Sequence, residues 1–430
     1  MTNTPSGFRD LLPKEAQQKE DMIQKIISVY RKYGFSPLET PIVEFQSTLV
    51  GDVTDFNLFN VNSNRERKKG SAQSMAMRFD LTVPLARVVV QYPELPKPFK
   101  RYQLGEVFRG ERPQKGRYRQ FTQLDADIVG SDSIYADADI ILMMYSVMNV
   151  LGINNFKIRV NTRKILNALP ELVGFSEKIL RDVLILLDKR DKVSQEELLN
   201  LLLQKGLSEK QAEQLVDFGN LSGSRTEVLQ GLQELFSGIE SAQEGLSDLE
   251  TINEVVSATD SEKIIFDMSI IRGLAYYTGA VFETVLDDYP QFGSVYSGGR
   301  YDNLIEKLGG PDISAVGASV GVDRLLAVLS EMKSSNEQKR DGYVVLVQDS
   351  SVLSYAFSIA EKIRSLNIEC DVYTGSKNLG SQFGYAESKG YLNAIILGQN
   401  ELENKSLIVK DLVTRNQKEI PFVDINNLKI

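Results

Sequence analysis

Arginine is the residue type with the clearest chemical potential in this sequence. The polar stretch RGERPQKGRYR at positions 109–119 holds Arg109, Arg112, Lys115, Arg117 and Arg119. Arg272 follows an apolar run, and Arg324 opens an apolar, helix-like segment. A guanidinium group donates two parallel hydrogen bonds to a phosphate and stays charged when buried. A cation at the positive end of a helix is unfavourable by itself, so Arg324 predicts an anionic partner. On charge alone, the stretch 109–119 also fits a solvated hairpin tip.

Carboxylates lie in the same part of the chain. Asp80 and Glu111 lie in or beside the region of the basic stretch, and Asp125 and Asp127 alternate with Ala126, which places both on one face of a strand. Each acid taken alone also fits a solvated or ion-paired side chain. Phosphoryl and nucleotidyl transfer depends mainly on positioning and charge stabilisation, usually with magnesium. Arginines and carboxylates are therefore groups that such a reaction can use.

The composition excludes several other kinds of chemistry. The 430 residues include 49 Lys plus Arg, 58 Asp plus Glu, a single cysteine and no histidine. Nucleophiles activated by histidine, imidazole bases and His-ligated zinc are therefore excluded. Cys370 has no partner for a disulfide within the chain, which fits a reducing cytosol. Neither of the common Gly-rich phosphate loops, G-x-x-x-x-G-K-[ST] or G-x-G-x-x-G, is present, so a nucleotide would bind without them.

Several elements can be placed by their periodicity. Apolar residues at helical spacing predict a helix after Pro13 that ends at Gly34. Its buried face should contain Ile23, Ile26, Ile27 and Tyr30. Positions 76–130 alternate strand-like runs, MRFDLTV and FTQLDADIVG, with the basic stretch, which predicts an antiparallel hairpin with a long basic tip. Further strand-like runs follow position 262, and AVGASVG leads into an apolar helix.

The chain divides into predicted domains by composition. Positions from about 174 to 256 are helical in pattern and include a capping box at Ser208 and Gln211, so we expect a helical insertion. The polar run 333–342 is the predicted linker, and the alternating strand and helix patterns of 343–430 predict a small α/β domain. The N-terminus lacks the pattern of a signal peptide, and no stretch approaches the roughly 18 apolar residues of a membrane span.

Longer motifs resemble one family over nearly the whole chain. FRGERPQKGRYRQFTQLDADIVG is similar to the second signature motif of class II aminoacyl-tRNA synthetases, and AVGASVGVDRLLAVL to the third. IIRGLAYYTGAVFE, SGGRYDNLIEKLGG, GFRDLLP and MRFDLTVPLAR resemble blocks of histidyl-tRNA synthetases. The resemblance implies an α+β catalytic domain, residues 1–332, with a class II antiparallel sheet and flanking helices. It also implies the helical insertion and a C-terminal α/β domain that binds the anticodon.

The resemblance implies roles for individual residues. Arg109 and Arg272 would be catalytic and would stabilise the α-phosphate and the reacting carboxylate, while Glu111 and Arg324 would complete the ATP site with Arg109. Magnesium would enter as the ATP complex. The histidine-binding residues would be Asp80, Thr82, Gln123, Asp127, Tyr276 and Tyr277. Asp127 and Tyr277 match the positions that bind the two imidazole nitrogens, and both nitrogens need partners when buried. Arg112 and Gln114 match positions that bind the cognate tRNA.

The implied activity is that of a histidine–tRNA ligase. Histidine would react with ATP to give histidyl adenylate and pyrophosphate, and a ribose hydroxyl of the tRNA would then take the histidyl group. The resemblance also implies a homodimer, formed through the first helix and the GFRDLLP segment. A non-catalytic relative, the regulatory subunit of ATP phosphoribosyltransferase, is the alternative.

The chain departs from the family pattern at three positions. Ala275 replaces the usual aspartate of RGLDYYTG, which favours the non-catalytic alternative. Thr122 stands where many bacterial members have histidine, and Gly110 where histidine or another bulky residue is common. The last two substitutions fit the loss of histidine throughout the chain. The intact arginine of the RGL block and the C-terminal domain favour the synthetase.

Overall fold

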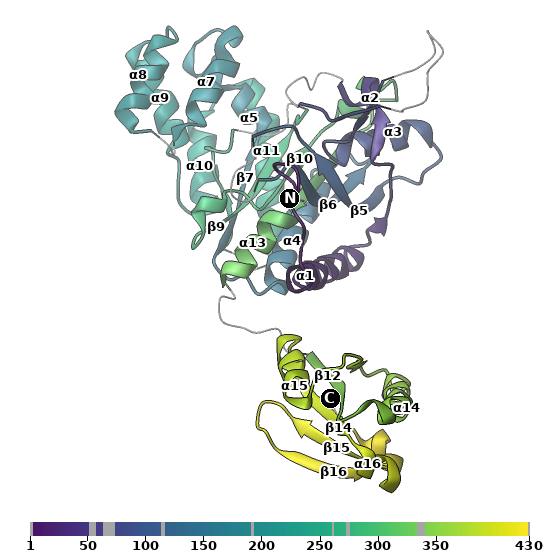
Figure 1. Ribbon diagram of the computed structural model, residues 1–430. Helices are drawn as coiled ribbons and strands as arrows, with labels where there is room; N and C mark the ends of the chain where they lie inside the picture. Colours follow the sequence, from purple (N-terminus) through teal and green to yellow (C-terminus); the bar gives the residue numbers. More distant parts are fainter. Residues whose placement is uncertain are drawn as a thin grey trace, which may run out of the picture. The chain divides into compact units, whose positions relative to one another are not determined.

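The computed structural model describes residues 3–50, 57–62, 74–112, 117–190, 193–259, 262–271, 276–332 and 340–428. The chain forms two compact units, which meet in the sequence between residues 332 and 333 (Figure 1). Residues 333–339, most of the predicted linker, lie outside the described residues, and strand β12 begins at Arg340, inside the range predicted as linker.

The first unit is built on a sheet of eight strands in the order β1-β5-β6-β11-β10-β9-β7-β8. All neighbouring strands are antiparallel except the two outer pairs, β1 with β5 and β7 with β8. The strands span β1 Ser36–Pro37, β5 Phe99–Phe108, β6 Gln120–Val129, β7 Phe156–Thr162, β8 Ile264–Phe266, β9 Ala280–Leu286, β10 Tyr296–Arg300 and β11 Ala315–Gly321. The neighbouring strands β5 and β6 are the predicted antiparallel hairpin, with Arg101 opposite Asp127.

Three helices cover one face of this sheet: α1 Pro13–Lys32, α4 Tyr135–Val150 and α13 Val322–Met332 (Figure 1). The predicted face of α1 is buried, including Ile23 and Ile26, and Gly34 beyond its end has a positive φ of 83° that favours glycine. Alternate residues of β6, such as Leu124 and Ala126, belong to the same hydrophobic core. The intervening residues of β6 therefore point to the opposite face of the sheet.

The pattern of MRFDLTV, residues 77–83, predicted one continuous strand, and this prediction is wrong. Only β4, Met75–Met77, is extended, and it joins β2, Val43–Phe45, and β3, Asn60–Val61, in a small sheet beside helix α2, Gln46–Val50. Helix α3, Thr82–Gln91, begins where the strand was expected to continue. The Asp80 Oδ1 accepts a hydrogen bond from the Val83 N–H, and Pro84 lies in the first turn, where its missing N–H has no helical partner to lose.

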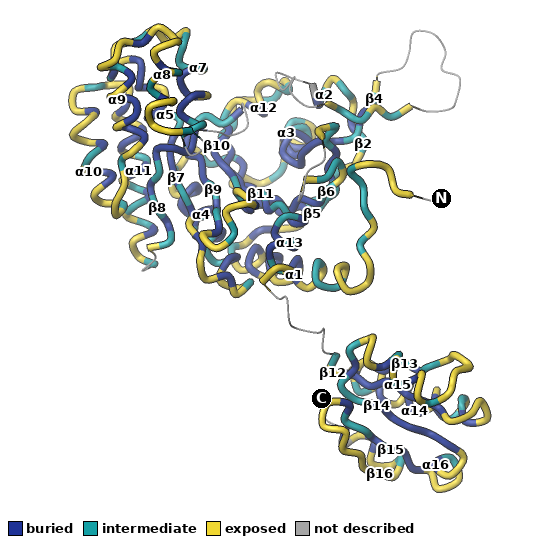
Figure 2. The backbone as a smooth tube through the Cα atoms, turned by 60° about the vertical axis from the view of Figure 1, so that its left-hand side comes forward, coloured by how far each residue is buried: buried dark blue, intermediate teal, exposed yellow. Residues whose placement is uncertain are grey.

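Short helices form the inserted segment between β7 and β8. They are α5 Arg163–Asn167, α6 Leu169–Val173, α7 Leu180–Leu187, α8 Gln195–Gln204, α9 Glu209–Gly219, α10 Arg225–Leu235 and α11 Gln243–Ser257. The predicted capping box at Ser208 and Gln211 is confirmed, and a second one joins Ser224 to Glu227. The apolar faces of these helices join the core of the large sheet, as the buried stretches in Figure 2 show.

The second unit is a five-stranded sheet in the order β13-β12-β14-β15-β16 with helices on both faces. Its strands are β12 Arg340–Val347, β13 Cys370–Val372, β14 Tyr391–Leu397, β15 Ser406–Asp411 and β16 Gln417–Pro421. Its helices are α14 Leu353–Arg364, α15 Leu379–Ser388 and α16 Gln399–Asn404. The first three strands in chain order are parallel, as alternating strand and helix patterns predicted, and β15 and β16 add an antiparallel edge. No helix in the described parts of the chain is long and apolar enough to cross a membrane.

Glycine at position 298 is required by the close packing of β10 against β11. A Cβ atom there would overlap the Gly317 carbonyl oxygen and would lie 2.5 Å from the Phe282 ring. Gly298→Ala should therefore lower the free energy of unfolding by about 2 kcal/mol. Gly231→Ala, in helix α10, is the control and should cause no loss, because its Cβ would meet only the movable side chain of Leu221. Urea unfolding followed by circular dichroism measures both, and equal stability of the two variants would contradict the prediction.

Candidate active site

A cavity of about 330 Å³ opens on the face of the large sheet opposite α1, α4 and α13. It is lined by Arg109, Glu111, Arg117, Tyr118, Phe121, Gln123, Tyr277, Ser294, Val295, Ser297, Ser319, Gly321, Asp323 and Arg324. These residues come from β6, β10, β11 and the chain beside their ends, from the basic stretch after β5, from the segment before β9 and from the first turn of α13. Four of the residues singled out by their charge and spacing, Arg109, Glu111, Arg117 and Arg324, therefore meet in one place, together with Gln123, which the resemblance implied.

Three arginines converge on this cavity. Arg109 donates from Nε to the Phe79 carbonyl oxygen at 3.0 Å, and its guanidinium carbon lies 5.1 Å from the centre of the Phe121 ring. Arg324 donates to the Ser294 carbonyl oxygen. Burial lowers the pKa of Arg324, and the positive charges of Arg117 and Arg109 lower it further. Like charges that repel one another around a cavity favour the binding of an anion between them.

A buried ion pair lies beneath the cavity. The Arg101 side chain is fully buried, and its Nη2 lies 2.8 Å from Asp127 Oδ2 and donates to the Leu81 carbonyl oxygen at 3.1 Å. Tyr301 donates its hydroxyl hydrogen to Asp127 Oδ1 at 2.6 Å. A Cβ at position 317 would overlap the Asp127 carboxylate, so glycine at that position makes room for the acid.

Asp80 forms a second buried carboxylate at the start of α3. Besides the Val83 N–H, it accepts a long hydrogen bond of 3.4 Å from the Tyr276 hydroxyl. The rings of Tyr276 and Tyr277 pack edge to face at 5.3 Å, and Tyr276 packs against Tyr301 at 5.8 Å. The two carboxylates are therefore joined by a layer of tyrosines, one of which, Tyr277, lines the cavity. Thr82, the first residue of α3, is also buried.

Hydrogen bonding fixes the orientation of the Gln123 amide. Its Nε2 donates to Ser319 Oγ at 2.7 Å, and Ser319 lies opposite Asp125 in the register of β11 against β6. A hydrogen bond from Ser319 lowers the pKa of Asp125, so the Asp125 carboxylate accepts the serine hydroxyl. The Oε1 of Gln123 is buried and has no protein partner among the described residues. That oxygen is consequently an acceptor available to a ligand.

The buried acids have perturbed pKa values. Burial raises the pKa of Asp80 to about 6, against the lowering effects of the Val83 N–H and of Arg109. Burial also raises the pKa of Asp125 to about 7, where Arg101 opposes the shift and Asp127 adds to it. Burial raises the pKa of Asp127 as well, and Arg101 and Tyr301 act in the opposite direction. Clusters of such groups in a cavity are typical of binding and catalytic sites.

Comparison with known proteins identifies the family. A family model described as histidyl-tRNA synthetase matches residues 7–325, and one described as an anticodon binding domain matches residues 342–428. The chain belongs to the histidyl-tRNA synthetase family. A histidine–tRNA ligase of Helicobacter hepaticus is 39% identical over 420 residues, which cover 96% of this chain and 94% of that protein. A histidine–tRNA ligase of Wolinella succinogenes is 38% identical and covers 96% and 95%.

Solved structures agree with this assignment. A histidyl-tRNA synthetase from Nostoc superposes with a TM-score of 0.88 at 29% identity, over 99% of this chain and 98% of that one. The predicted class II architecture is thereby confirmed. An ATP phosphoribosyltransferase regulatory subunit/histidyl-tRNA synthetase from Bacillus halodurans superposes with a TM-score of 0.76 at 23% identity, covering 93% and 98%, which shows a shared fold only.

The remaining residues that the resemblance predicted for the site lie in different places. Asp80, Thr82, Asp127 and Tyr276 lie buried behind the cavity, and Tyr277 lies at its wall. Arg112 is exposed at the end of a described stretch. Arg272, Ala275 and Gln114 lie outside the described residues, so their assigned roles stay predictions.

Several residues at or beside this cavity were missed by reasoning from the sequence. Tyr301, whose hydroxyl donates to Asp127, belongs to the quoted SGGRYD block, and its place in that block was the signal that could have found it. Ser319 and Asp323 belong to the quoted AVGASVGVDRLLAVL block, which was their signal. Arg101 gave no such signal, because the register of β5 against β6 brings it to Asp127 and register cannot be read from the sequence.

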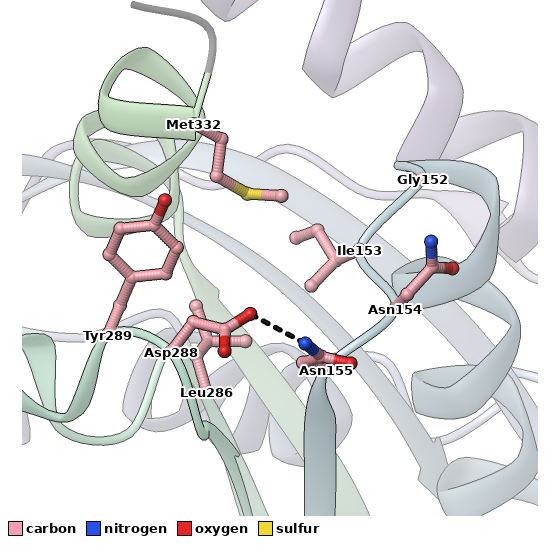
Figure 3. A pocket seen from close by; sticks show the side chains of 8 residues that line it. All are labelled: Gly152, Ile153, Asn154, Asn155, Leu286, Asp288, Tyr289 and Met332. Carbon is pink, nitrogen blue, oxygen red and sulfur yellow. Dashed lines mark hydrogen bonds between the residues drawn. The ribbon is translucent and has the colours of Figure 1, made fainter.

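A second cavity of about 180 Å³ lies elsewhere in the first unit (Figure 3). It is lined by Gly152, Ile153, Asn154, Asn155, Leu286, Asp288, Tyr289 and Met332. Asn155 donates from Nδ2 to Asp288 Oδ2 at 2.8 Å across it. Its lining contains no cation, so it differs in kind from the arginine-lined cavity.

The raised pKa of Asp125 predicts a pH-dependent stability. Between the pKa of the unfolded chain, near 4, and that of the folded protein, about 7, only the folded state retains the proton. The stability contributed by this group is therefore present below pH 4 and is lost as the pH rises through 7. Asp125→Asn imitates the protonated acid, so its stability relative to wild type should be more favourable at pH 8 than at pH 5. Urea unfolding of both proteins at each pH tests this, and parallel pH curves would refute it.

Proposed function

We propose that this chain activates histidine with ATP in the arginine-lined cavity and then transfers the histidyl group to its tRNA. The observation that carries the proposal is a single cavity with two different halves. Its rim collects arginines that repel one another, and its floor, lined by Gln123 and Tyr277, is backed by buried carboxylates and tyrosines. A phosphate-bearing substrate fits the first half, and a small polar side chain fits the second.

The arginine half is the proposed ATP site. Arg109 and Arg324 lie where their guanidinium groups can contact phosphate oxygens, and Glu111 lies at the same wall for the adenosine part. Arg272 would join them as the second catalytic arginine. Magnesium would arrive bound to ATP as part of the substrate. The charge of the phosphates would relieve the repulsion among the arginines, which gives nucleotide binding a direct electrostatic cause.

The floor is the proposed histidine site. The free Oε1 of Gln123 and the carboxylate of Asp80 are acceptors suited to an α-ammonium group, with Thr82 beside them. Asp127 and Tyr277 would bind the two imidazole nitrogens, and Tyr276 would hold Asp80. Tyr301 already donates to Asp127, so that carboxylate is oriented before the ligand arrives. Buried polar atoms left without partners penalise an amino acid that cannot satisfy them.

The proposed reaction needs no histidine in the protein. The carboxylate of the substrate is ionised at neutral pH and can attack the α-phosphorus without a base. A new oxygen–phosphorus bond forms as the bond to pyrophosphate breaks, and negative charge grows on the oxygens around phosphorus. Arg109 and Arg272 would stabilise that charge. The ribose hydroxyl of the tRNA would then attack the acyl carbon and release AMP.

The tRNA would contact both units. Arg112 and Gln114, in the basic stretch 109–119 of the sequence, are the proposed contacts to the end of the tRNA that enters the site. The second unit would bind the anticodon. We place the reaction in the cytoplasm, where the lone, buried Cys370 would stay reduced.

The proposal is tested by pyrophosphate exchange with each of the twenty amino acids, followed by charging of tRNA. Wild type should exchange label with histidine alone and should then charge the histidine tRNA. Arg272→Ala should lower histidine-dependent exchange by about 100-fold or more, because it removes a charge that acts at the transition state.

Circular dichroism should show an unchanged fold for Arg272→Ala. Exchange at the wild-type rate in this variant would remove Arg272 from its role. Binding of histidine by the wild type without any exchange would instead favour the non-catalytic alternative.

The protein should form a homodimer. Large apolar side chains are exposed in the N-terminal part of the first unit, namely Leu12, Ile42, Phe45 and Leu104. A monomer leaves such groups in water, whereas a dimer interface buries them. Light scattering at micromolar concentration should give twice the chain mass of 48.1 kDa, and Leu104→Asp should shift the protein towards the monomer. A monomeric wild type would contradict the prediction.

A further inference from the structure

The N-terminal segment is fastened to the rim of the cavity. The Arg119 N–H donates to the Gly7 carbonyl oxygen at 2.8 Å, and the Phe8 ring packs edge to face on Phe59 at 5.9 Å. Gly7 has a φ of 87°, and a Cβ there would lie 2.7 Å from the Arg119 side chain. The approach of residues 6–9 to the returning arm of the basic hairpin is therefore close and specific.

In this position Arg9 contacts Asp323 in the first turn of α13. Its Nη2 donates to Asp323 Oδ1 at 2.7 Å, and its guanidinium carbon lies 4.2 Å from the centre of the Tyr118 ring. The other oxygen of Asp323 accepts the Thr122 N–H at 2.7 Å. Both oxygens of this carboxylate are thus occupied by groups outside the cavity lining.

Asp323 poses an electrostatic problem for an ATP site. It lines the same cavity as Arg109, Arg117 and Arg324 and directly precedes Arg324 in the chain. An unpaired carboxylate there would repel the phosphates and would compete with them for the arginines. Its side chain is only 8% exposed, so water screens this charge weakly.

We propose that Arg9 is a positioning residue for nucleotide binding, which holds Asp323 in an ion pair so that the arginines of the cavity stay available to ATP. The inference rests on the proposed ATP role of this cavity. It assigns a function to the N-terminal segment that is separate from dimer formation. Arg9 itself does not line the cavity, so it acts through Asp323 and not by contact with substrate.

The chain offers a matched control for the loss of an ion pair. Arg87 pairs with Glu44 at 2.8 Å, with side chains 24% and 6% exposed, and Arg9 pairs with Asp323 at 2.7 Å, with side chains 27% and 8% exposed. Neither Arg87 nor Glu44 lines the cavity. Arg87→Gln therefore measures what breaking a similar ion pair does to stability alone.

The test is histidine-dependent pyrophosphate exchange by the full chain, with the KM for ATP, the KM for histidine and kcat determined separately. Arg9→Gln should raise the KM for ATP about tenfold, with kcat and the KM for histidine changed less than about twofold. Arg9→Lys keeps the charge and should remain near wild type. The double variant Arg9→Gln, Asp323→Asn should recover most of the loss, because no unpaired carboxylate remains.

Each alternative result is decisive. An unchanged KM for ATP in Arg9→Gln, an equal rise in Arg87→Gln, or no recovery in the double variant would overturn the inference. If Arg9→Gln fails to fold, Asp323→Asn alone decides, because a raised KM for ATP in that variant would show that the carboxylate assists binding. Absence of exchange in the wild type would refute the proposed function itself, whereas normal wild-type exchange with an unaffected Arg9→Gln refutes only the role of Arg9.

Discussion

The floor of the site is organised around one fully buried positive charge. Arg101 lies inside the sheet, where an unpaired cation would cost several kcal/mol, and Asp127 and the Leu81 carbonyl oxygen compensate it only in part. The sequence around it meets the demands of that charge. Gly317 leaves room for the Asp127 carboxylate, and Tyr301 holds its other oxygen. Such a floor is rigid, since moving any of these groups would leave a buried charge without its partner.

The two halves of the cavity carry net charges of opposite sign. Behind the floor lie three buried carboxylates, Asp80, Asp125 and Asp127, and the two buried guanidinium groups of Arg101 and Arg78, whereas the rim holds three arginines. A substrate with an ammonium or imidazole at one end and a carboxylate beside a triphosphate at the other satisfies both. The orientation of the substrate therefore follows from charge before any shape is considered.

Much of the fold could be predicted from the sequence because periodic patterns report which face of an element is buried. Ile23 and Ile26 on α1, the capping box at Ser208 and the strands of the second unit are of this kind. The pattern was misleading at MRFDLTV, where the side chain of Asp80 and the ring of Pro84 start a helix in an otherwise strand-like run. The partners of Asp127 could not be predicted, because Arg101 and Gly317 meet it through strand pairings between segments far apart in the chain.

The two positions that depart from the family by lacking histidine have different physical explanations. Gly110 donates its N–H to the Asn57 carbonyl oxygen at 2.9 Å, and a Cβ at this position would lie 2.7 Å from the Cβ of Asn57. The close approach of Asn57 therefore requires glycine here, whatever the supply of histidine. Thr122 is different, because its hydroxyl donates to Glu106 at 2.5 Å and accepts from Lys19, while its N–H binds Asp323. The threonine hydroxyl offers one donor and one acceptor, and a neutral imidazole offers the same pair. Of these two positions, Thr122 is therefore the one at which another side chain can take over the hydrogen bonds of a histidine.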